Sequence, residues 1–421
     1  MIKEPRIQMF DLLNCLSSAM DLVNPKLVNH HKQVAYVALC IARELNLPAD
    51  QQTDLVYAGL LHDIGAISLA EKLQALQFEF ENPQKHAELG YMLIKVYEPF
   101  ARIAPLIRFH HVPWDEGYGA EFNGEKVPFG SHILHLADRI AISVQKEEDI
   151  FGQEKDVISK IEEHATDMFV PELVAISKDL IQREYFMLDL TSNSIGTILS
   201  NMIVLPTIEE NIDGLLSLAR LFAHVIDFRS RFTSTHSSGV ATTAKLLAEY
   251  AGLSQRQCKM MEFAGYVHDL GKLAVPPEIL EKPAKLTSEE FNMIKKHTYY
   301  TYRALEPIAD LKDINMWASF HHERLNGSGY PFHHKGENLV LEARIMAVAD
   351  IFTAITEDRP YRKGMPDEKA LHVIEQMAND SFIDSNVVSL LKLHFDEINT
   401  ARKAAQAASS VEYERLLKVT N

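Results

Sequence analysis

The stretches YVHDLGKLA (residues 266–274) and FHHERLNGSGYP (residues 320–331) decide how this chain is organised. The first places a histidine beside an aspartate and follows them with a glycine and a lysine. The second holds two adjacent histidines before a glycine-rich turn. Imidazole nitrogens combined with carboxylate oxygens suit first-row transition metals such as Fe, Mn, Zn or Ni better than Mg or Ca. The two stretches therefore predict a metal site.

The same pattern occurs twice along the chain, which indicates a tandem duplication. LLHDIGA (residues 60–66) matches YVHDLGK (residues 266–272) without a gap, at an offset of 206 residues. Further histidine and aspartate matches follow at offsets of 211 and 212, and IEEHATDMF (residues 161–169) matches IEQMANDSF (residues 374–382) at 213. Small loop insertions account for the increase of this offset from 206 to 213 residues. We therefore expect two related domains.

Between these motifs the apolar residues recur at spacings of three and four, which predicts amphipathic helices rather than strands. Residues 34–45 and 240–253 each read as one helix, and a Thr287–Glu290 capping pair opens another that runs to about residue 308. Residues 212–228 read as a long helix that leads into the second repeat. The predicted fold is all-α, with two tandem helical-bundle domains. The predicted boundaries are an N-terminal domain at 1–185, a linker at 186–211, a C-terminal domain at 212–405 and a helical tail at 406–421.

Composition excludes several classes of function. Lysine and arginine total 42 against 58 aspartate and glutamate, a net charge of −16, which argues against binding of DNA, RNA or an anionic membrane. Cys15, Cys40 and Cys258 lack the spacing of paired ligands, and we expect them to be reduced and buried. The chain shows neither a signal peptide nor a stretch that could span a bilayer. We therefore expect a soluble, cytoplasmic protein.

Seven side chains of the second repeat form a set of potential metal ligands. They are His236, His268, Asp269, His297, His321, His322 and Asp350. Spread over several helices, they can converge only in the core of a bundle. Adjacent residues on a helix point about 100° apart, so we expect His268 and Asp269 not to chelate one ion together.

A bridging carboxylate removes this difficulty. We assign Asp269 as the bridge of a dinuclear centre. The other six side chains divide into His236, His268 and Asp350 on one ion, and His297, His321 and His322 on the other. Two ions about 3.5 to 4 Å apart can clamp a phosphoryl group and activate water for in-line attack. The predicted reaction is therefore phosphoester hydrolysis.

Three motifs carry a family resemblance: HDLGK at 268–272, HHERLNGSGYP at 321–331 and ADIFTAITEDRPYR at 349–362. Together they resemble the signature of the HD-GYP phosphodiesterases, a branch of the HD metal-dependent phosphohydrolases, over about residues 210–400. The resemblance implies HD-type helical domains and a di- or trinuclear centre, usually of iron or manganese. It also implies an enzyme that linearises 3′,5′-cyclic dinucleotides such as cyclic di-GMP or the mixed guanine–adenine form.

The resemblance also implies individual roles. Asp269 and Lys272 would be catalytic, with Lys272 helping to hold a phosphate. The implied substrate-binding residues are Arg324, Gly329, Tyr330, Arg359, Tyr361 and Arg362. Members of the family with three metals place a glutamate four residues before the first histidine, where this chain has Phe232. We therefore predict two divalent ions, Fe or Mn, in the C-terminal domain.

The first repeat keeps the potential metal ligands but lacks most other residues of the family signature. Its possible second metal site consists of His30, His62, Asp63, His86, His110, His111 and Asp138. HHVPWDEGYG (residues 110–119) looks like an eroded GYP loop, Ala66 stands in place of the lysine, and nothing after Asp138 resembles RPYR. Three interpretations compete: a metal-stabilised scaffold or sensor, a second hydrolase that removes the 5′-phosphate of the linear product, or an inert relic.

The predicted function is hydrolysis of a cyclic dinucleotide by the second repeat, with the first repeat regulatory or a second phosphohydrolase. The alternatives are a 5′-nucleotidase, an alarmone hydrolase, or an adaptor that binds the nucleotide without cutting it. An intact ligand set with HDxGK argues against the adaptor, because a binder needs no activated water. The sequence leaves open which cyclic dinucleotide is preferred, and whether the partner is a second copy of the chain or a signalling protein.

Overall fold

The chain divides into two compact units, whose bodies are Gln8–Ile208 and Glu209–Lys418. Both are built almost wholly of helices, so the all-α prediction is confirmed. The computed structural model describes residues 7–22, 24, 27–66, 69–79, 82–145, 149–203, 209–210, 212–228, 235–358 and 363–420. Within these ranges, none of the helices combines the length and the apolar character needed to cross a membrane.

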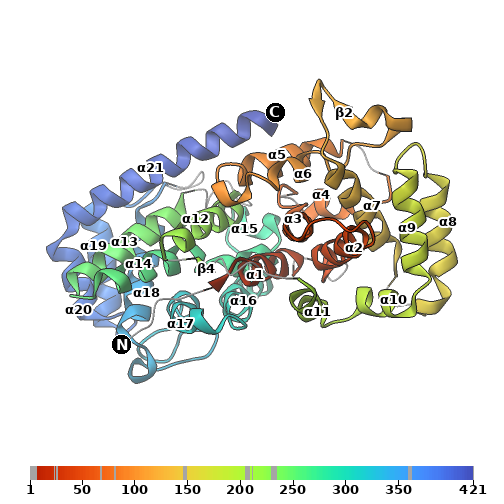
Figure 1. The fold of residues 1–421 in the computed structure, drawn as a ribbon. Helices are drawn as coiled ribbons and strands as arrows, with labels where there is room; N and C mark the ends of the chain where they lie inside the picture. The colour runs from red at the N-terminus through yellow and green to blue at the C-terminus, as the bar shows by residue number, and fades with distance from the viewer. Residues whose placement is uncertain are drawn as a thin grey trace. The chain divides into compact units, whose positions relative to one another are not determined.

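The N-terminal unit is organised around one central helix. Its helices are α1 (Met9–Asp21), α2 (His30–Glu44), α3 (Ala49–Leu61), α4 (Leu69–Ala75), α5 (Gln84–Ile94), α6 (Ala104–Arg108), α7 (Phe129–Ser143), α8 (Glu154–Glu163), α9 (Pro171–Ile181), α10 (Glu184–Thr191) and α11 (Ile195–Met202) (Figure 1). Strand β1 (Ile7–Gln8) precedes α1, and β2 (Glu121–Phe122) pairs antiparallel with β3 (Glu125–Lys126). Every residue from 34 to 42 is buried, as expected of a helix that is apolar on all sides. Helix α2 therefore forms the core, packed against α3 and α7.

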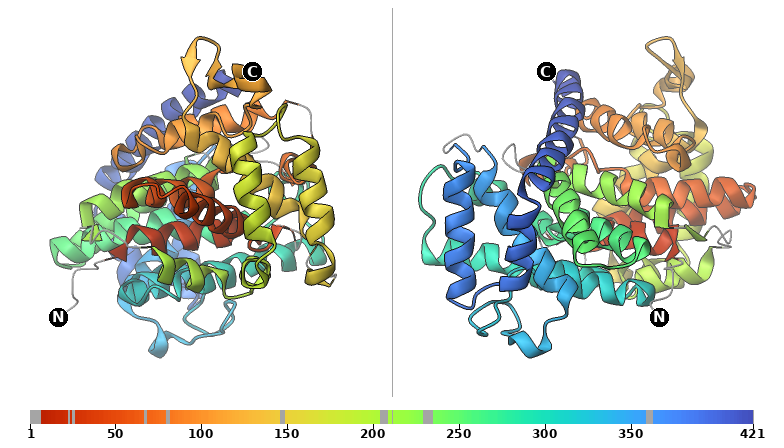
Figure 2. Two further views of the ribbon diagram at one scale, coloured as in Figure 1. Left: turned by 45° about the vertical axis from the view of Figure 1, so that its right-hand side comes forward. Right: turned by 90° about the vertical axis from the view of Figure 1, so that its left-hand side faces the viewer.

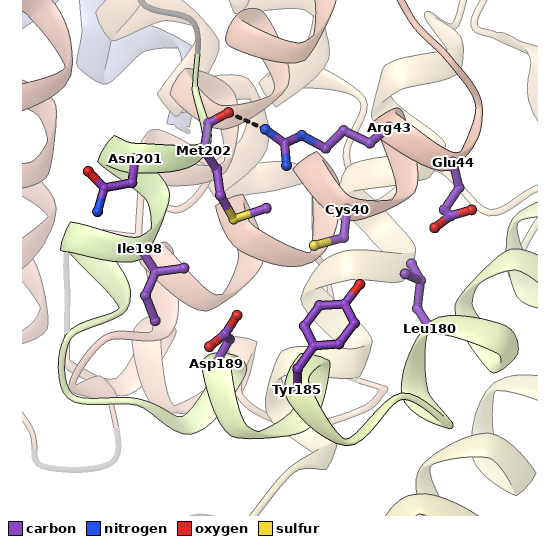
Figure 3. Close-up of a pocket in the computed structure, with 9 residues that line it drawn as sticks. All are labelled: Cys40, Arg43, Glu44, Leu180, Tyr185, Asp189, Ile198, Asn201 and Met202. Atoms are coloured by element: carbon purple, nitrogen blue, oxygen red, sulfur yellow. Dashed lines mark hydrogen bonds between the residues drawn. The ribbon is translucent and has the colours of Figure 1, made fainter.

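Helices α10 and α11 occupy the segment that the sequence analysis treats as a linker. Both pack onto α2 inside the N-terminal unit. Gln33 donates a hydrogen bond to the carbonyl of Leu190 at 2.8 Å, and Arg43 donates to the carbonyl of Met202 (Figure 3). A cavity of about 410 Å³ opens between these helices, with Tyr185 among the residues that line it. Residues 186–202 thus belong to the domain that they follow.

The C-terminal unit repeats the same core. Its elements are β4 (Glu209–Glu210), α12 (Ile212–Phe228), α13 (His236–Tyr250), α14 (Gln255–Val267), α15 (Pro277–Leu280), α16 (Ser288–Leu305), α17 (Lys312–Ser319), α18 (Leu341–Thr356), α19 (Asp367–Asn379), α20 (Ser385–Leu393) and α21 (Phe395–Thr420). Helix α12 has the predicted bounds. The predicted capping pair is present at α16, where Glu290 N donates to the Thr287 hydroxyl at 3.2 Å and Thr287 N donates to the Glu290 carboxylate at 2.7 Å.

A shared helix crossing supports the duplication. Helix α13 packs on α14 and α18, as α2 packs on α3 and α7. Gly265 of α14 lies against the backbone of Ala241, and Gly59 of α3 lies against the backbone of Ala35. Each pair is separated from its counterpart by the offset of 206 residues. A Cβ on either glycine would collide with the facing backbone, so both bundles need the same residue at the same crossing.

Helix α21 is longer than the predicted tail. It begins at Phe395 and continues without a break through residue 406, where the sequence analysis places a separate tail. Gln406 donates to the carboxylate of Glu357 at 3.4 Å, and Glu412 lies 3.0 Å from His224 of α12. Figure 2 shows the neighbouring α19 and α20 side by side. The first part of the predicted tail is therefore an integral helix of the C-terminal unit.

Candidate functional site

The seven predicted ligands of the C-terminal unit converge in its core. His236 is the first residue of α13, His297 lies in α16 and Asp350 in α18. The remaining four follow helix ends: His268 and Asp269 come after α14, and His321 and His322 come after α17. Six of the seven are buried, and His322 is half-buried. Five helices thus bring one polar cluster together in the core of the unit.

Asp269 lies at the centre of this cluster. Its Oδ2 is 3.2 Å from Nε2 of His268 and 3.9 Å from Nε2 of His236. Its Oδ1 is 3.3 Å from Nε2 of His297 and 4.0 Å from Nε2 of His321. The two oxygens of one carboxylate therefore face two different groups of histidines, which is the geometry that a bridging ligand requires.

The expectation that His268 and Asp269 point apart was wrong. Helix α14 ends at Val267, and Asp269 has left the helical conformation, with φ −96° and ψ 11°. The backbone turns between the two residues, so their side chains approach instead of diverging by a helical step. The pair can therefore contribute to the same ion while the second oxygen of Asp269 serves another.

The ligand atoms fall into groups small enough to surround an ion. The atoms of His236, His268 and Asp350 all lie within 4.8 Å of one another, and so do those of His297, His321 and His322. These are the residues that the sequence analysis allots to two separate ions. A third group of His268, Asp269 and His321 joins the first two. The donors of each group are of the kind that coordinates a divalent transition-metal cation.

Backbone contacts orient three of the histidines toward the cluster. Nδ1 of His268 lies 2.7 Å from the carbonyl of Gly265, Nδ1 of His297 lies 2.7 Å from that of Ile294, and Nδ1 of His321 lies 2.6 Å from that of Ala318. A carbonyl only accepts, so Nδ1 carries the proton and Nε2 is left as a free ligand. Nε2 of His268 and Oδ1 of Asp269 are buried without a hydrogen-bond partner. Bound cations would satisfy these atoms.

The electrostatics of Asp269 and His297 favour the protonation states in which these side chains bind metals. His236 differs, because Glu357 and Asp350 outweigh the effect of burial and raise its pKa to about 10. Burial alone would raise the pKa of Asp269, but His268 and Lys272 lower it well below the usual range of a carboxyl group. Burial lowers the pKa of His297 to about 3. The ammonium of Lys272 contacts Oδ2 of Asp269. The site therefore holds an ionised carboxylate beside a neutral imidazole, and both are the forms in which these side chains coordinate cations.

Two buried glutamates that the sequence analysis did not select support the site. Glu357 lies 3.1 Å from Nδ1 of His236. Glu323 accepts hydrogen bonds from the backbone N–H groups of Phe332 at 2.7 Å and His334 at 3.0 Å, and so fixes the end of the glycine-rich turn. Both belong to the motifs that carry the family resemblance, in HHER and in AITED. Their place within these motifs was the available signal, since Glu323 directly follows His322 and Glu357 lies one residue before the end of AITED.

The glycine-rich turn closes against the cluster. The ring of Tyr330 lies 4.9 Å from the ring of His322. Gly329 approaches the backbone of Glu323 so closely that a Cβ would collide with it. The guanidinium of Arg324 lies over the ring of Phe382 at 4.3 Å. The predicted substrate residues Arg359, Tyr361 and Arg362, and also Phe232, lie outside the described residues.

The N-terminal unit assembles the corresponding cluster around Asp63. Oδ1 of Asp63 is 3.1 Å from His86 and 3.8 Å from His110, while Oδ2 is 3.5 Å from His62 and 4.0 Å from His30. The buried atoms without a hydrogen-bond partner include Nε2 of His30, His62 and His110, Oδ1 of Asp63 and Oδ1 of Asp138. The potential ligand groups are His30, His62 and Asp63, and Asp63, His86, His110 and His111. The two repeats therefore share one arrangement of donors.

The surroundings of the two clusters differ. Arg139 is fully buried next to Asp138, contacts its carboxylate, and donates to the carbonyls of Ala75 at 3.1 Å and Phe78 at 2.8 Å. Tyr118, the counterpart of Tyr330 at an offset of 212, is 78% exposed and so does not cover the N-terminal cluster. The donors are kept in the N-terminal unit, whereas the lysine and the covering tyrosine are not.

The sequence of this chain is similar to those of known HD-domain proteins. The model of the HD domain family matches residues 14–157 and 220–387. The 3′3′-cGAMP-specific phosphodiesterase 1 of Vibrio cholerae is 31% identical over 387 residues, which cover 90% of this chain and 89% of the relative. The cyclic di-GMP phosphodiesterase response regulator RpfG of Xanthomonas campestris is 38% identical over 178 residues, 42% of this chain and 47% of the relative.

A solved structure shares the fold. The crystal structure of V-cGAP3, a cyclic GMP-AMP specific phosphodiesterase of Vibrio cholerae, superposes with a TM-score of 0.66 at 23% sequence identity. The match covers 94% of this chain and 98% of that chain. Both repeats therefore lie within the shared fold.

Proposed function

Because this chain belongs to the HD-GYP family of HD-domain phosphodiesterases, we propose that its C-terminal unit hydrolyses a 3′,5′-cyclic dinucleotide to the linear dinucleotide. The observation that carries the proposal is the position of Asp269, whose two oxygens face two groups of histidines. The named activities of the relatives, cyclic di-GMP and 3′3′-cGAMP hydrolysis, give the class of substrate.

Two divalent cations, Fe or Mn, would be held by the seven ligands, with Asp269 between them. When bound, they supply Lewis-acid stabilisation of the phosphoryl oxygens and an activated water. Lys272 adds a positive charge beside Asp269, where the phosphodiester would lie. Tyr330 stands at the rim next to His322 and limits the access of bulk water. Glu357 holds His236 in position through Nδ1.

We propose a separate metal centre for the N-terminal unit. The orphaned donors around Asp63 support it. Ala66 and the exposed Tyr118 argue against the same cyclic substrate there. The unit would then act either as a metal-stabilised regulator or as a second phosphohydrolase acting on the linear product.

The test is a hydrolysis assay of the full chain loaded separately with Fe(II) and Mn(II), on cyclic di-GMP and on 3′3′-cGAMP. Asp269→Ala and Asp63→Ala form a matched pair, because the two residues hold equivalent places in the repeats. We expect Asp269→Ala to abolish ring opening and Asp63→Ala to retain it. If the metal-loaded wild type cuts neither substrate, the proposal fails and the nucleotidase and adaptor alternatives take its place.

A further inference from the structure

The exposed face of α16 carries aromatic and basic side chains in alternation. Phe291, Lys295, Tyr299 and Arg303 follow one another at a spacing of four residues, which places them on one side of the helix. Phe291 is 44% exposed and Tyr299 is 39% exposed. Nζ of Lys295 lies 4.9 Å above the Phe291 ring, and the Arg303 guanidinium lies 5.1 Å above the Tyr299 ring. Large exposed aromatic rings beside cations are unexpected on the solvated face of a chain with a net charge of −16.

The same face borders a cavity next to the candidate metal centre. The cavity has a volume of about 470 Å³ and is lined from α16 by Lys295, Lys296, Tyr299 and Tyr300, and from the glycine-rich turn by Ser328, Gly329, Tyr330, Pro331 and His333. Nζ of Lys295 lies 5.5 Å from the centre of the Tyr330 ring. The ring of Tyr330 also lies near the ring of His322, with 4.9 Å between the two ring centres. One aromatic ring therefore connects the cavity to the metal ligands.

The charges of this cavity are available to a ligand. Arg303, at the C-terminal end of this face of α16, is paired with Glu306 at 2.6 Å. Among the residues that the structure describes, neither Lys295 nor Lys296 has a carboxylate within ion-pair distance. Two lysines without acidic partners in so acidic a chain form a local positive site, which an anion would neutralise.

A cyclic dinucleotide needs such a second site. It has two phosphodiesters and two bases, and only one phosphodiester can occupy the reacting position at a time. The other phosphate requires a cation, and the bases offer flat faces that stack on aromatic side chains. A lysine pair beside exposed tyrosines supplies both kinds of contact.

We propose that the cavity between α16 and the glycine-rich turn binds the nucleotide that is not being cleaved. Lys295 neutralises its phosphate, and Tyr299 stacks on its base. This assignment rests on the proposed function of the C-terminal unit and adds to it the residues that distinguish a dinucleotide from a simple phosphodiester.

The test compares a large and a small substrate on the full-length, metal-loaded enzyme. For Lys295→Gln and Tyr299→Ala we expect KM for the cyclic dinucleotide to rise about tenfold or more, while kcat stays within about twofold. Hydrolysis of bis(4-nitrophenyl) phosphate, which has no second nucleotide, stays at the wild-type rate in both variants. Lys312→Gln, an exposed lysine at the start of α17, is the charge-matched control and leaves both substrates unaffected.

Two results would overturn the assignment. An unchanged KM in both variants would show that the cavity does not hold the substrate. Equal losses on both substrates would show that the two residues act on the metal centre instead. Failure of the proposed function is distinguishable from either, because the wild type itself would then leave the cyclic dinucleotide intact.

Discussion

Nδ1 of His236 lies 3.1 Å from Oε2 of Glu357, and Nε2 of the same ring lies 3.1 Å from Oδ1 of Asp350. Glu357 is buried, and Gln406 donates to the same oxygen at 3.4 Å. Glu357 thus fixes the orientation of the His236 ring through Nδ1, while Nε2 faces the cluster of predicted ligands. Carboxylate–histidine pairs of this kind orient ligands and raise their basicity in metal sites.

Glu357→Gln is therefore expected to weaken metal binding in the C-terminal unit. The amide keeps the volume and loses the charge that supports His236, and such changes typically cost about 10- to 100-fold in metal affinity. The measurement is metal content during competition with a chelator of known affinity. Glu375→Gln removes a half-buried carboxylate of the same unit that is paired with Lys392 at 2.5 Å, away from the predicted ligands, and should leave the affinity unchanged. Equal affinities for the two variants would contradict the role of Glu357.

Removal of metal should lower the melting temperature. Without cations, buried donors around Asp269 and Asp63 lack hydrogen-bond partners. A ligand present at about 100 times its Kd adds about 2.7 kcal/mol to the folded state, which for domains of this size corresponds to about 5 to 10 °C. Thermal unfolding before and after chelation, followed by readdition of Mn(II), measures the effect. A melting temperature that does not respond to metal would contradict both metal centres.

Much of the fold followed from periodicity and from the repeat. The bounds of α12 and the capping pair of α16 were read from local patterns, because helix starts depend on a few neighbouring residues. The convergence of the seven ligands followed from the matched offsets of the histidines, since a duplicated core must place them alike.

Other features depend on contacts that local patterns do not contain. The relation between His268 and Asp269 was mispredicted, because the pattern did not reveal that α14 ends at Val267. Helices α10 and α11 are short and looked like a linker, and only their packing against α2 assigns them to a domain. Arg139 follows a predicted ligand in sequence, but its carbonyl partners lie about 60 residues earlier in the chain.

Arg139→Lys is expected to destabilise the N-terminal unit although the charge is kept. The planar guanidinium reaches Asp138 and the carbonyls of Ala75, Gln77 and Phe78 at once, which a single ammonium cannot do. Leaving buried acceptors unpaired costs about 1 to 3 kcal/mol each. Urea unfolding should shift to lower midpoints, whereas Arg102→Lys, at an exposed pair with Asp50, should not shift it. Similar midpoints for the two variants would mean that Arg139 does not hold these segments together.

The stability of the N-terminal unit should depend on the ionisation of Cys15. Burial raises the pKa of this thiol to about 12, from 9.0 in its ordinary state. A group whose pKa is raised by folding contributes stability that is fully present below the unfolded pKa and is lost as the pH rises toward the folded one. Between pH 8 and pH 10 the wild type should therefore lose about 1 kcal/mol that Cys15→Ala does not lose.

The measurement isolates this thiol from the other groups that titrate at high pH. The chain has two tryptophans, so in a Trp317→Phe background the fluorescence of Trp114 reports unfolding of the N-terminal unit alone. The difference in unfolding free energy between Cys15 and Cys15→Ala chains should shrink as the pH rises from 8 to 10, because lysines and tyrosines contribute equally to both. A difference that stays constant would mean that the thiol is exposed to water in the folded chain, contrary to its 5% exposure in the structure.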